Sequence, residues 1–132
     1  MIYAIDTNII SYLLRTYPQV ESKFQETVKN GNECIIPPMV YYEIKRWLIL
    51  NNAKSKLKRF ESLCLSTKKI TVDINIWDKA IEIYTVLAKN GNLISDNDIL
   101  IAAYCLINDY TLVTNNTNEF MRVPGLEVEN WA

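Results

Sequence analysis

The sequence predicts an α/β protein in which a central, mainly parallel sheet lies between layers of helices. Short apolar runs alternate along the chain with longer segments whose apolar residues recur every three or four positions. The short runs are typical of buried parallel strands and the longer segments of amphipathic helices. Their alternation is typical of a three-layer fold. The chain of 132 residues contains no repeat or linker, so we expect a single domain over 1–132.

The first half of the chain passes twice from a strand pattern to helix patterns. In order, the expected elements are a strand that ends at Ile5, a helix over 9–14, a helix over 19–30, a strand over 34–36, a helix over 39–51 and a helix over 53–65. Asn30 and Gly31 close the second helix, and Pro38 suits the first turn of the third. Apolar spacing places Val28 and Trp47 on the inner faces of their helices.

The second half is expected to continue this alternation and to end on an edge strand. Its expected elements are a strand over 70–72, a long helix that ends at Asn90 and Gly91, an apolar helix over 97–108, a strand over 111–114, a loop or short turn over 115–121 and an edge strand over 126–128. One face of the long helix is expected to pack on the core, because its apolar residues recur at helical spacing. That face consists of Ile74, Trp77, Ile81, Tyr84, Leu87 and Ala88.

Composition excludes several kinds of chemistry. The chain has no histidine, which rules out histidine-based triads, histidine general bases and histidine-rich zinc sites. Its three glycines are too few for a phosphate-binding loop, and Cys34, Cys64 and Cys105 are expected to be reduced core residues. Acids outnumber bases by 15 to 14, so only a local basic face would attract nucleic acid. Without a membrane-length apolar run or a signal-peptide pattern, we expect a cytoplasmic protein with no membrane contact.

Five acids follow expected strands or begin the helices after them. These acids are Asp6, Glu43, Asp96, Asp98 and Glu119. In a parallel sheet, the carboxyl ends of the strands and the amino ends of the following helices share one edge. We therefore expect the five carboxylates to face the same crevice.

Carboxylates gathered in one crevice repel each other, and a hard cation would neutralise them. Oxygen ligands without histidine or cysteine select Mg²⁺ or Mn²⁺ rather than zinc. Such a site suits phosphodiester hydrolysis, in which the cation polarises a phosphoryl oxygen and a carboxylate accepts the proton of the attacking water. Four polar residues would orient the carboxylates, the water or a phosphate: Asn8, Thr114, Asn115 and Asn116.

Each of these residues also has a structural interpretation. Asp6 can cap the helix that follows it, and Ser95 with Asp98 resembles a capping box. Glu43 can be a solvated helix residue, and Glu119 an exposed loop residue. The asparagines are equally typical of turns. The set of acids is therefore more informative than any one member.

The motifs that contain these acids resemble the PIN domain, and more closely the VapC toxins of bacterial type II toxin–antitoxin systems. The resemblance rests on Ile5-Asp6-Thr7-Asn8, Tyr42-Glu43-Ile44, the segment from Asp98 to Ala103, and the segment from Leu112 to Phe120. It implies a PIN-like fold and a Mg²⁺-dependent ribonuclease with catalytic acids Asp6, Glu43 and Asp98, and with Asp96 nearby. Asn115 and Asn116 stand where many members have a fourth acid. Glu119 is the available substitute.

The resemblance also implies partners. A VapC-like protein would cleave structured RNA, including transfer RNA, and stop translation until a VapB-like antitoxin neutralises it. It would also form a homodimer. Lys45 and Arg46 follow Glu43 and would contact RNA phosphates beside the acids, although a solvated helix face explains them as well.

Two other functions are compatible with the sequence. A PIN-like module that binds RNA or protein with little catalysis would explain the asparagines at 115 and 116. A phosphatase with Asp6 as covalent nucleophile is less favoured, because such enzymes carry a second aspartate two residues on, where this chain has Asn8.

Overall fold

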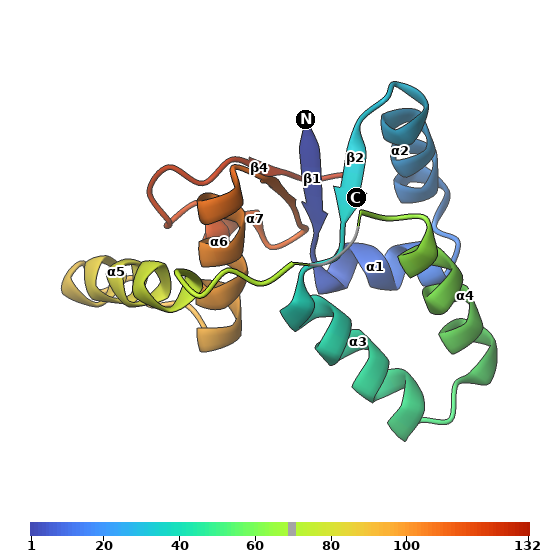
Figure 1. Ribbon diagram of the computed structural model, residues 1–132, viewed down its shortest axis with the longest axis horizontal. Coiled ribbons are helices and arrows are strands. Elements are labelled where there is room, and N and C mark those ends of the chain that lie inside the picture. Colours follow the sequence, from blue (N-terminus) through green and yellow to red (C-terminus); the bar gives the residue numbers. More distant parts are fainter. Residues whose placement is uncertain (69–70) are drawn as a thin grey trace.

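The computed structural model describes residues 1–68 and 71–132 and has the expected three layers. Its four strands are β1 (Ile2–Ile5), β2 (Glu33–Ile35), β3 (Thr111–Val113) and β4 (Val128–Glu129). All neighbouring pairs are parallel, in the order β2-β1-β3-β4. Figure 1 shows helices on both sides of this sheet, with α5 and α6 on one side and α2 and α4 on the other. The predicted α/β fold with a parallel sheet is confirmed.

The helices follow the predicted segments to within a few residues. They are α1 (Thr7–Leu14), α2 (Pro18–Lys29), α3 (Pro38–Leu50), α4 (Lys54–Leu65), α5 (Ile76–Lys89), α6 (Asp96–Asn108) and α7 (Thr117–Phe120). No helix within the described ranges combines the length and apolarity that a bilayer span requires. Pro38 occupies the first turn of α3, where its missing N–H costs no hydrogen bond. Gly31 follows α2 with a φ of 83°, a conformation that suits glycine.

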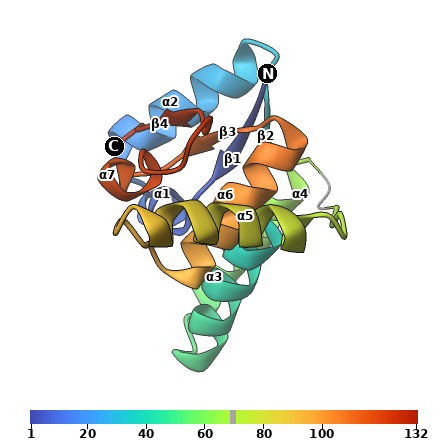
Figure 2. The ribbon, with the colours of Figure 1, turned by 90° about the vertical axis from the view of Figure 1, so that its left-hand side faces the viewer.

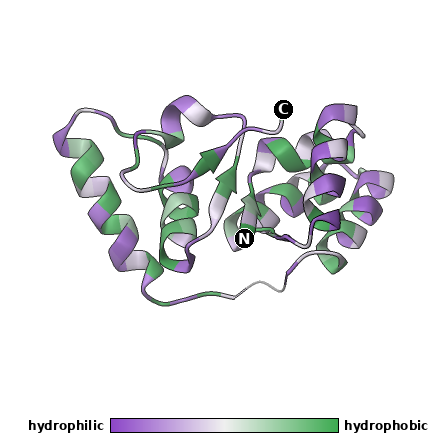
Figure 3. Ribbon diagram, turned by 90° about the horizontal axis from the view of Figure 1, so that it is seen from above, coloured by the Kyte–Doolittle hydropathy of each residue, from purple (hydrophilic) through white to green (hydrophobic). Residues whose placement is uncertain are grey.

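The centre of the sheet fixes where polar side chains can gather. Ala4 of β1 pairs with Ile35 of β2 on one side and with Leu112 of β3 on the other, and all three are fully buried. The strands are accordingly apolar in Figure 3, which views the layers from above. After β1 the chain forms β2 on one side of β1 and then crosses over to form β3 on the other side. The carboxyl ends of β1 and β3 are therefore the topological switch point, where open α/β sheets bind ligands.

The expected strand over 70–72 is not part of this sheet. Ile70 lies outside the described residues, while Thr71 and Val72 are exposed and belong to no strand. Nearby, Ile35 and Lys68 form an isolated parallel bridge. A three-residue apolar run carries too little information to separate a strand from an extended connection.

Helix α5 shows the largest departure from the predicted packing. Its buried residues are Ile76, Ile83 and Leu87, whereas Ile81 of the predicted inner face is 62% exposed. Ile74, Trp77 and Tyr84 are exposed with it. Nine of the 14 residues of α5 are apolar and occupy a wide arc, and α6 packs on only one part of that arc. Periodicity detected the arc but could not show which part would be covered.

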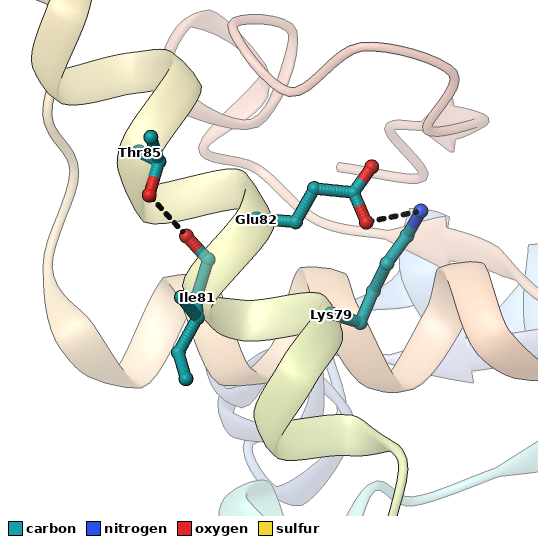
Figure 4. Close-up of polar contacts among 4 residues, drawn as sticks. All are labelled: Lys79, Ile81, Glu82 and Thr85. Atoms are coloured by element: carbon teal, nitrogen blue, oxygen red, sulfur yellow. Dashed lines mark hydrogen bonds and ion pairs between the residues drawn. The ribbon is translucent and has the colours of Figure 1, made fainter.

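The polar residues of α5 make local contacts (Figure 4). Lys79 lies 3.5 Å from Glu82, and the Thr85 hydroxyl donates to the Ile81 carbonyl at 2.8 Å. These i,i+3 and i,i+4 contacts hold side chains against their own helix. Figure 2 shows α5 lying across the front of α6, so the face of α5 away from α6 has no further layer over it.

Two smaller corrections concern single residues of α2 and α3. Val28 is exposed and Thr27 is buried in its place, with its hydroxyl donating to the Lys23 carbonyl at 2.7 Å. Trp47 is 53% exposed on α3, although Ile44 and Leu48 of the same predicted face are buried. The three cysteines are free, and Cys34 and Cys105 are buried as expected.

Candidate functional site

Asp6 lies at the switch point, directly after β1 and at the N-cap of α1. Its backbone N–H donates to the Val113 carbonyl at 2.9 Å, which anchors it to the end of β3. The side chain is only 4% exposed. Burial raises the pKa of this carboxyl above its ordinary value, and the negative charge of Glu43 adds to the rise, while hydrogen bonds from Thr114, Thr7 and Asn8 oppose it. Asp6 is thus both a helix cap and a buried acid.

Polar residues after β1 and β3 hold Asp6 in place. The Thr114 hydroxyl donates to Oδ2 of Asp6 at 2.7 Å and is itself fully buried. It accepts hydrogen bonds from the Asn8 amide at 3.3 Å and from the Asn116 backbone N–H at 3.0 Å. Asn8 also accepts from the backbone N–H of Asn115 at 2.9 Å. This network joins residues more than 100 positions apart in the chain and fixes the orientation of the Asp6 carboxylate.

Glu43 reaches the same edge of the sheet from α3. Its Oε2 accepts a hydrogen bond from the Thr7 hydroxyl at 2.9 Å and another from the Asn97 amide at 3.0 Å. Thr7 begins α1 and Asn97 lies in the first turn of α6, so Glu43 links α3 to the starts of two other helices. In Figure 1, the β1 arrowhead points to the region where α1 and α3 begin. Both donors bind Oε2, so neither of them donates to the Oε1 atom.

Asp98 belongs to the first turn of α6, and its carboxyl is influenced by the charges of the other acids. Its backbone N–H donates to the Ser95 hydroxyl at 3.2 Å, as in the predicted N-cap. Partial burial, followed by the negative charges of Asp6, Glu119 and Glu43, raises the pKa of the Asp98 carboxyl to about 6. Since the charges of Asp6, Glu119 and Glu43 all act on Asp98, the four carboxylates lie in one region, which we call the acidic edge.

Glu119 and Asp96 occupy different positions relative to the acidic edge. Glu119, on the short helix α7, accepts a hydrogen bond from the Asn116 amide at 3.0 Å and acts on Asp98 through its charge. Asp96 is exposed and lines a groove of about 390 Å³ between α5 and α6, together with Trp77 and Tyr84. The structure therefore brings Glu119, but not Asp96, toward the acidic edge.

The acidic edge fits a hard divalent cation in the chemistry of its donors. Its carboxylates supply the oxygen ligands that Mg²⁺ and Mn²⁺ prefer. Burial, with a smaller contribution from neighbouring negative charges, raises the pKa of Asp6 and of Asp98, and a bound cation would stabilise the charged form of both. Over residues 1–68 and 71–132, no three acidic or cysteine side chains are close enough to hold one ion together. Side-chain movement of the acids toward the ion would therefore accompany binding.

A basic pocket opens beside Glu43, between α1, α3 and α4. It has a volume of about 320 Å³ and is lined by Thr7, Ser11, Leu14, Arg15, Glu43, Ile44, Arg46, Trp47, Leu48 and Lys56. Arg46, predicted to contact RNA, is part of this wall. Lys45 is not, because its Nζ donates to the Tyr41 hydroxyl at 2.8 Å and lies 5.2 Å from the centre of that ring.

Sequence reasoning missed several residues of this region. Thr7 and Asn97 hold Glu43, yet both follow helix starts, where threonine and asparagine are expected for reasons of capping. Arg15 and Lys56 line the basic pocket from helices that are distant in sequence. The position of Thr7 next to Asp6 and of Asn97 next to Asp98 was the available signal.

Comparison with known proteins agrees with this geometry. Residues 3–126 match the PIN domain, so the chain belongs to the PIN-domain family. It is 33% identical to Ribonuclease VapC2 of Rickettsia felis, with 99% of this chain and 98% of the relative covered. It is 27% identical to the tRNA(fMet)-specific endonuclease VapC of Shigella flexneri, with 98% of each covered.

A solved structure shares the whole arrangement of elements. VapBC2 from Rickettsia felis, bound to a DNA fragment from its promoter, contains a chain that superposes with a TM-score of 0.87 at 32% identity. The match covers 100% of both chains. The resemblance expected from the sequence is thus confirmed for both family and fold.

Proposed function

We propose that this chain is an endoribonuclease toxin of the VapC kind, which hydrolyses phosphodiester bonds in structured RNA and thereby inhibits translation. One observation supports the proposal: Asp6, Glu43 and Asp98 come from three separate elements, yet the charge of Glu43 raises the pKa of Asp6 and the charges of Asp6 and Glu43 raise the pKa of Asp98. The name of the Shigella flexneri relative makes transfer RNA the first substrate to test.

Asp6, Glu43 and Asp98 would hold a divalent cation, Mg²⁺ or Mn²⁺, with Glu119 as a further acid on the α7 side. When bound, such a cation polarises a phosphoryl oxygen and lowers the pKa of water. Hydrolysis forms a bond from the water oxygen to phosphorus and breaks the bond to the leaving sugar oxygen. Because the chain has no histidine, a carboxylate of the acidic edge would take the proton of the water.

The surrounding residues would keep the acids in position for this reaction. Thr114 and Asn8 orient Asp6, while Thr7 and Asn97 orient Glu43. Donors that hold a carboxylate in one rotamer reduce the entropy lost when it meets a ligand. Asn115 and Asn116 leave Glu119 as the acid on the α7 side, so occupancy of a second cation depends on that residue.

A VapB-like antitoxin is the expected protein partner, since the solved Rickettsia felis relative is a VapBC complex. The antitoxin would cover the acidic edge and block access of RNA. We also propose that the chain acts as one PIN domain and assembles as a homodimer.

The test is RNA cleavage by the purified chain in Mg²⁺, in EDTA, and by the Asp6→Asn and Asp98→Asn variants. We expect cleavage by the wild type in Mg²⁺ alone. Asp78→Asn, at an acid of α5 outside the site, is the matched control and should cleave as the wild type does. Equal residual cleavage in every arm would contradict the proposal.

A PIN-like module that binds RNA or protein with little catalysis is the second candidate. Two observations favour it: asparagines occupy positions 115 and 116, and no three of the described acids converge on a single ion-sized point. RNA binding in the wild type without any Mg²⁺-dependent cleavage would support this candidate.

A further inference from the structure

The basic pocket concentrates positive charge beside the acidic edge of a chain whose net charge is −1. Arg15, Arg46 and Lys56 reach it from three different helical segments, and Glu43 is the acid among its lining residues. Within the described part of the chain, none of the three cations forms an ion pair with an acid. Cations that meet in a pocket without acidic partners can bind the phosphates of a ligand.

The two guanidinium groups are held in place by aromatic rings of their own segments. Arg46 lies 4.9 Å from the centre of the Tyr42 ring, and Arg15 lies 5.2 Å from the centre of the Tyr12 ring. Arg15 also donates its Nε hydrogen to the Ser11 carbonyl at 3.4 Å. Each contact uses one face or one donor of the guanidinium, so the remaining N–H groups can still donate to an anion.

Trp47 supplies an aromatic surface in the same pocket. It is 53% exposed, while Leu14 and Leu48 of the pocket lining are buried. An exposed tryptophan among unpaired cations is the combination that binds single-stranded nucleic acid, in which bases stack on rings and phosphates meet basic side chains. The volume of about 320 Å³ is that of a small-ligand pocket and has room for one nucleotide.

We propose that this pocket binds one unpaired nucleotide of the RNA strand next to the cleaved bond, with its base stacked on Trp47 and its phosphate held by Arg15, Arg46 and Lys56. The inference rests on the proposed function, because it takes RNA as the substrate. It adds a subsite that selects an unstacked base near the acidic edge. Contact through Glu43, which lines the pocket and belongs to the acidic edge, makes the subsite continuous with the site of cleavage.

The test measures binding of a short single-stranded oligoribonucleotide to the full chain carrying Asp98→Asn, which prevents cleavage during the titration. Fluorescence anisotropy of labelled RNA reports affinity. We expect Trp47→Ala to weaken binding about 5- to 150-fold, the range for loss of one base stack. Trp77→Ala is the matched control, because Trp77 is 57% exposed on α5 and should leave the affinity unchanged.

A second readout tests stacking itself. Tryptophan fluorescence should be quenched by RNA, and Trp47→Phe should remove most of this quenching while it retains affinity, since phenylalanine still stacks. Equal RNA affinity of the Trp47→Ala and Trp77→Ala variants would overturn the inference. The proposed function would be unaffected by that result, because it depends on cleavage by the wild type.

Discussion

The acidic edge and the basic pocket share Glu43 but are built in different ways. At the acidic edge, Asp6 and Thr114 are buried and are held by hydrogen bonds between segments that are distant in sequence. In the basic pocket, Arg46 and Arg15 contact residues three or four positions back in their own segments. The acidic edge therefore depends on contacts that also stabilise the folded chain, whereas the side chains of the basic pocket depend on local contacts at the surface. Substitutions should therefore affect stability and cation binding in the first region, and RNA binding alone in the second.

The largest effect is expected at the acids themselves. Asp98→Asn should reduce Mg²⁺-dependent RNA cleavage by more than about 100-fold, since groups that merely orient metal ligands are already worth 10- to 100-fold. The variant should fold, because Ser95 caps α6 and the Asp98 backbone N–H is unchanged. Single-turnover cleavage at saturating RNA measures this. Cleavage at the wild-type rate would leave Asp98 with a purely structural role.

The donors to Glu43 are expected to have the next largest effect. Thr7→Val and Asn97→Leu each remove one hydrogen bond to Oε2, so each should reduce cleavage about 10-fold, and the double variant more. RNA affinity should not change in Asn97→Leu, because Asn97, unlike Thr7, does not line the basic pocket. A double variant no worse than either single variant would show that the two donors do not act on Glu43 jointly.

Substitutions at the acidic edge should lower the stability of the chain more than substitutions in the basic pocket. Thr114→Val deprives Asp6, Asn8 and the Asn116 N–H of their shared buried partner and should lower the free energy of unfolding by about 1–3 kcal/mol. Trp47→Ala, at an exposed position of the basic pocket, should change it by no more than about 0.5 kcal/mol. Urea denaturation of both variants measures the difference. Similar losses of unfolding free energy in the two variants would show that the acidic edge and the basic pocket do not differ in their contribution to stability.

Burial of Asp98, together with repulsion from the neighbouring acids, makes the stability of the chain depend on pH. The pKa of Asp98 rises from 3.8 to about 6 on folding, so the folded chain binds its proton more tightly and stability falls as pH increases from about 4 to about 6. In EDTA near neutral pH, Asp98→Asn should therefore be more stable than the wild type, by about 1 kcal/mol after allowance for partial solvent screening.

Added Mg²⁺ should reduce that difference, because the cation stabilises only the chain that binds it. Thermal unfolding at several pH values, with and without Mg²⁺, measures both effects. A wild type whose stability does not respond to pH in this range would contradict the placement of Asp98 among other acids.

The smallest expected effect is on the salt dependence of RNA binding, and it should differ between the adjacent basic residues Lys45 and Arg46. Arg46→Ala should reduce the slope of log affinity against log salt by about 0.7, the value for one contact to a single-stranded phosphate. Lys45→Ala should leave the slope unchanged, because Lys45 is bound to Tyr41 outside the pocket. RNA titrations at several salt concentrations measure both slopes. Equal changes would return Lys45 to the RNA contact predicted from the sequence.

The fold and the acidic edge were largely accessible from the sequence, for a physical reason. Strand ends can be located from local apolar runs, and parallel topology then places the residues after them, such as Asp6 and Thr114, at one edge. Thr7 and Asn97 were not recognised, because their partner Glu43 lies on another helix and their types also suit helix starts. The basic pocket depends on how α1, α3 and α4 pack together, which no local pattern records.

Helix α5 shows the limit of periodicity most clearly. Ile81 and Ile83 are two positions apart and equally apolar, yet only Ile83 is buried. The neighbour α6 decides between them, and its position follows from the whole fold. The strand expected over 70–72 shows a similar limit, because a short apolar run needs a pairing partner that the sequence does not identify, and Thr71 and Val72 belong to no strand.

Mn²⁺ binding measured by electron paramagnetic resonance tests most directly whether Asp6, Glu43 and Asp98 form one cation site. We expect the wild type to bind Mn²⁺, and Asp6→Asn, Glu43→Gln and Asp98→Asn each to weaken binding at least about 10-fold. Asp96→Asn, two positions from Asp98 but at the α5 groove, should bind as the wild type does. Wild-type Mn²⁺ affinity in the Asp6, Glu43 and Asp98 variants would contradict the shared site.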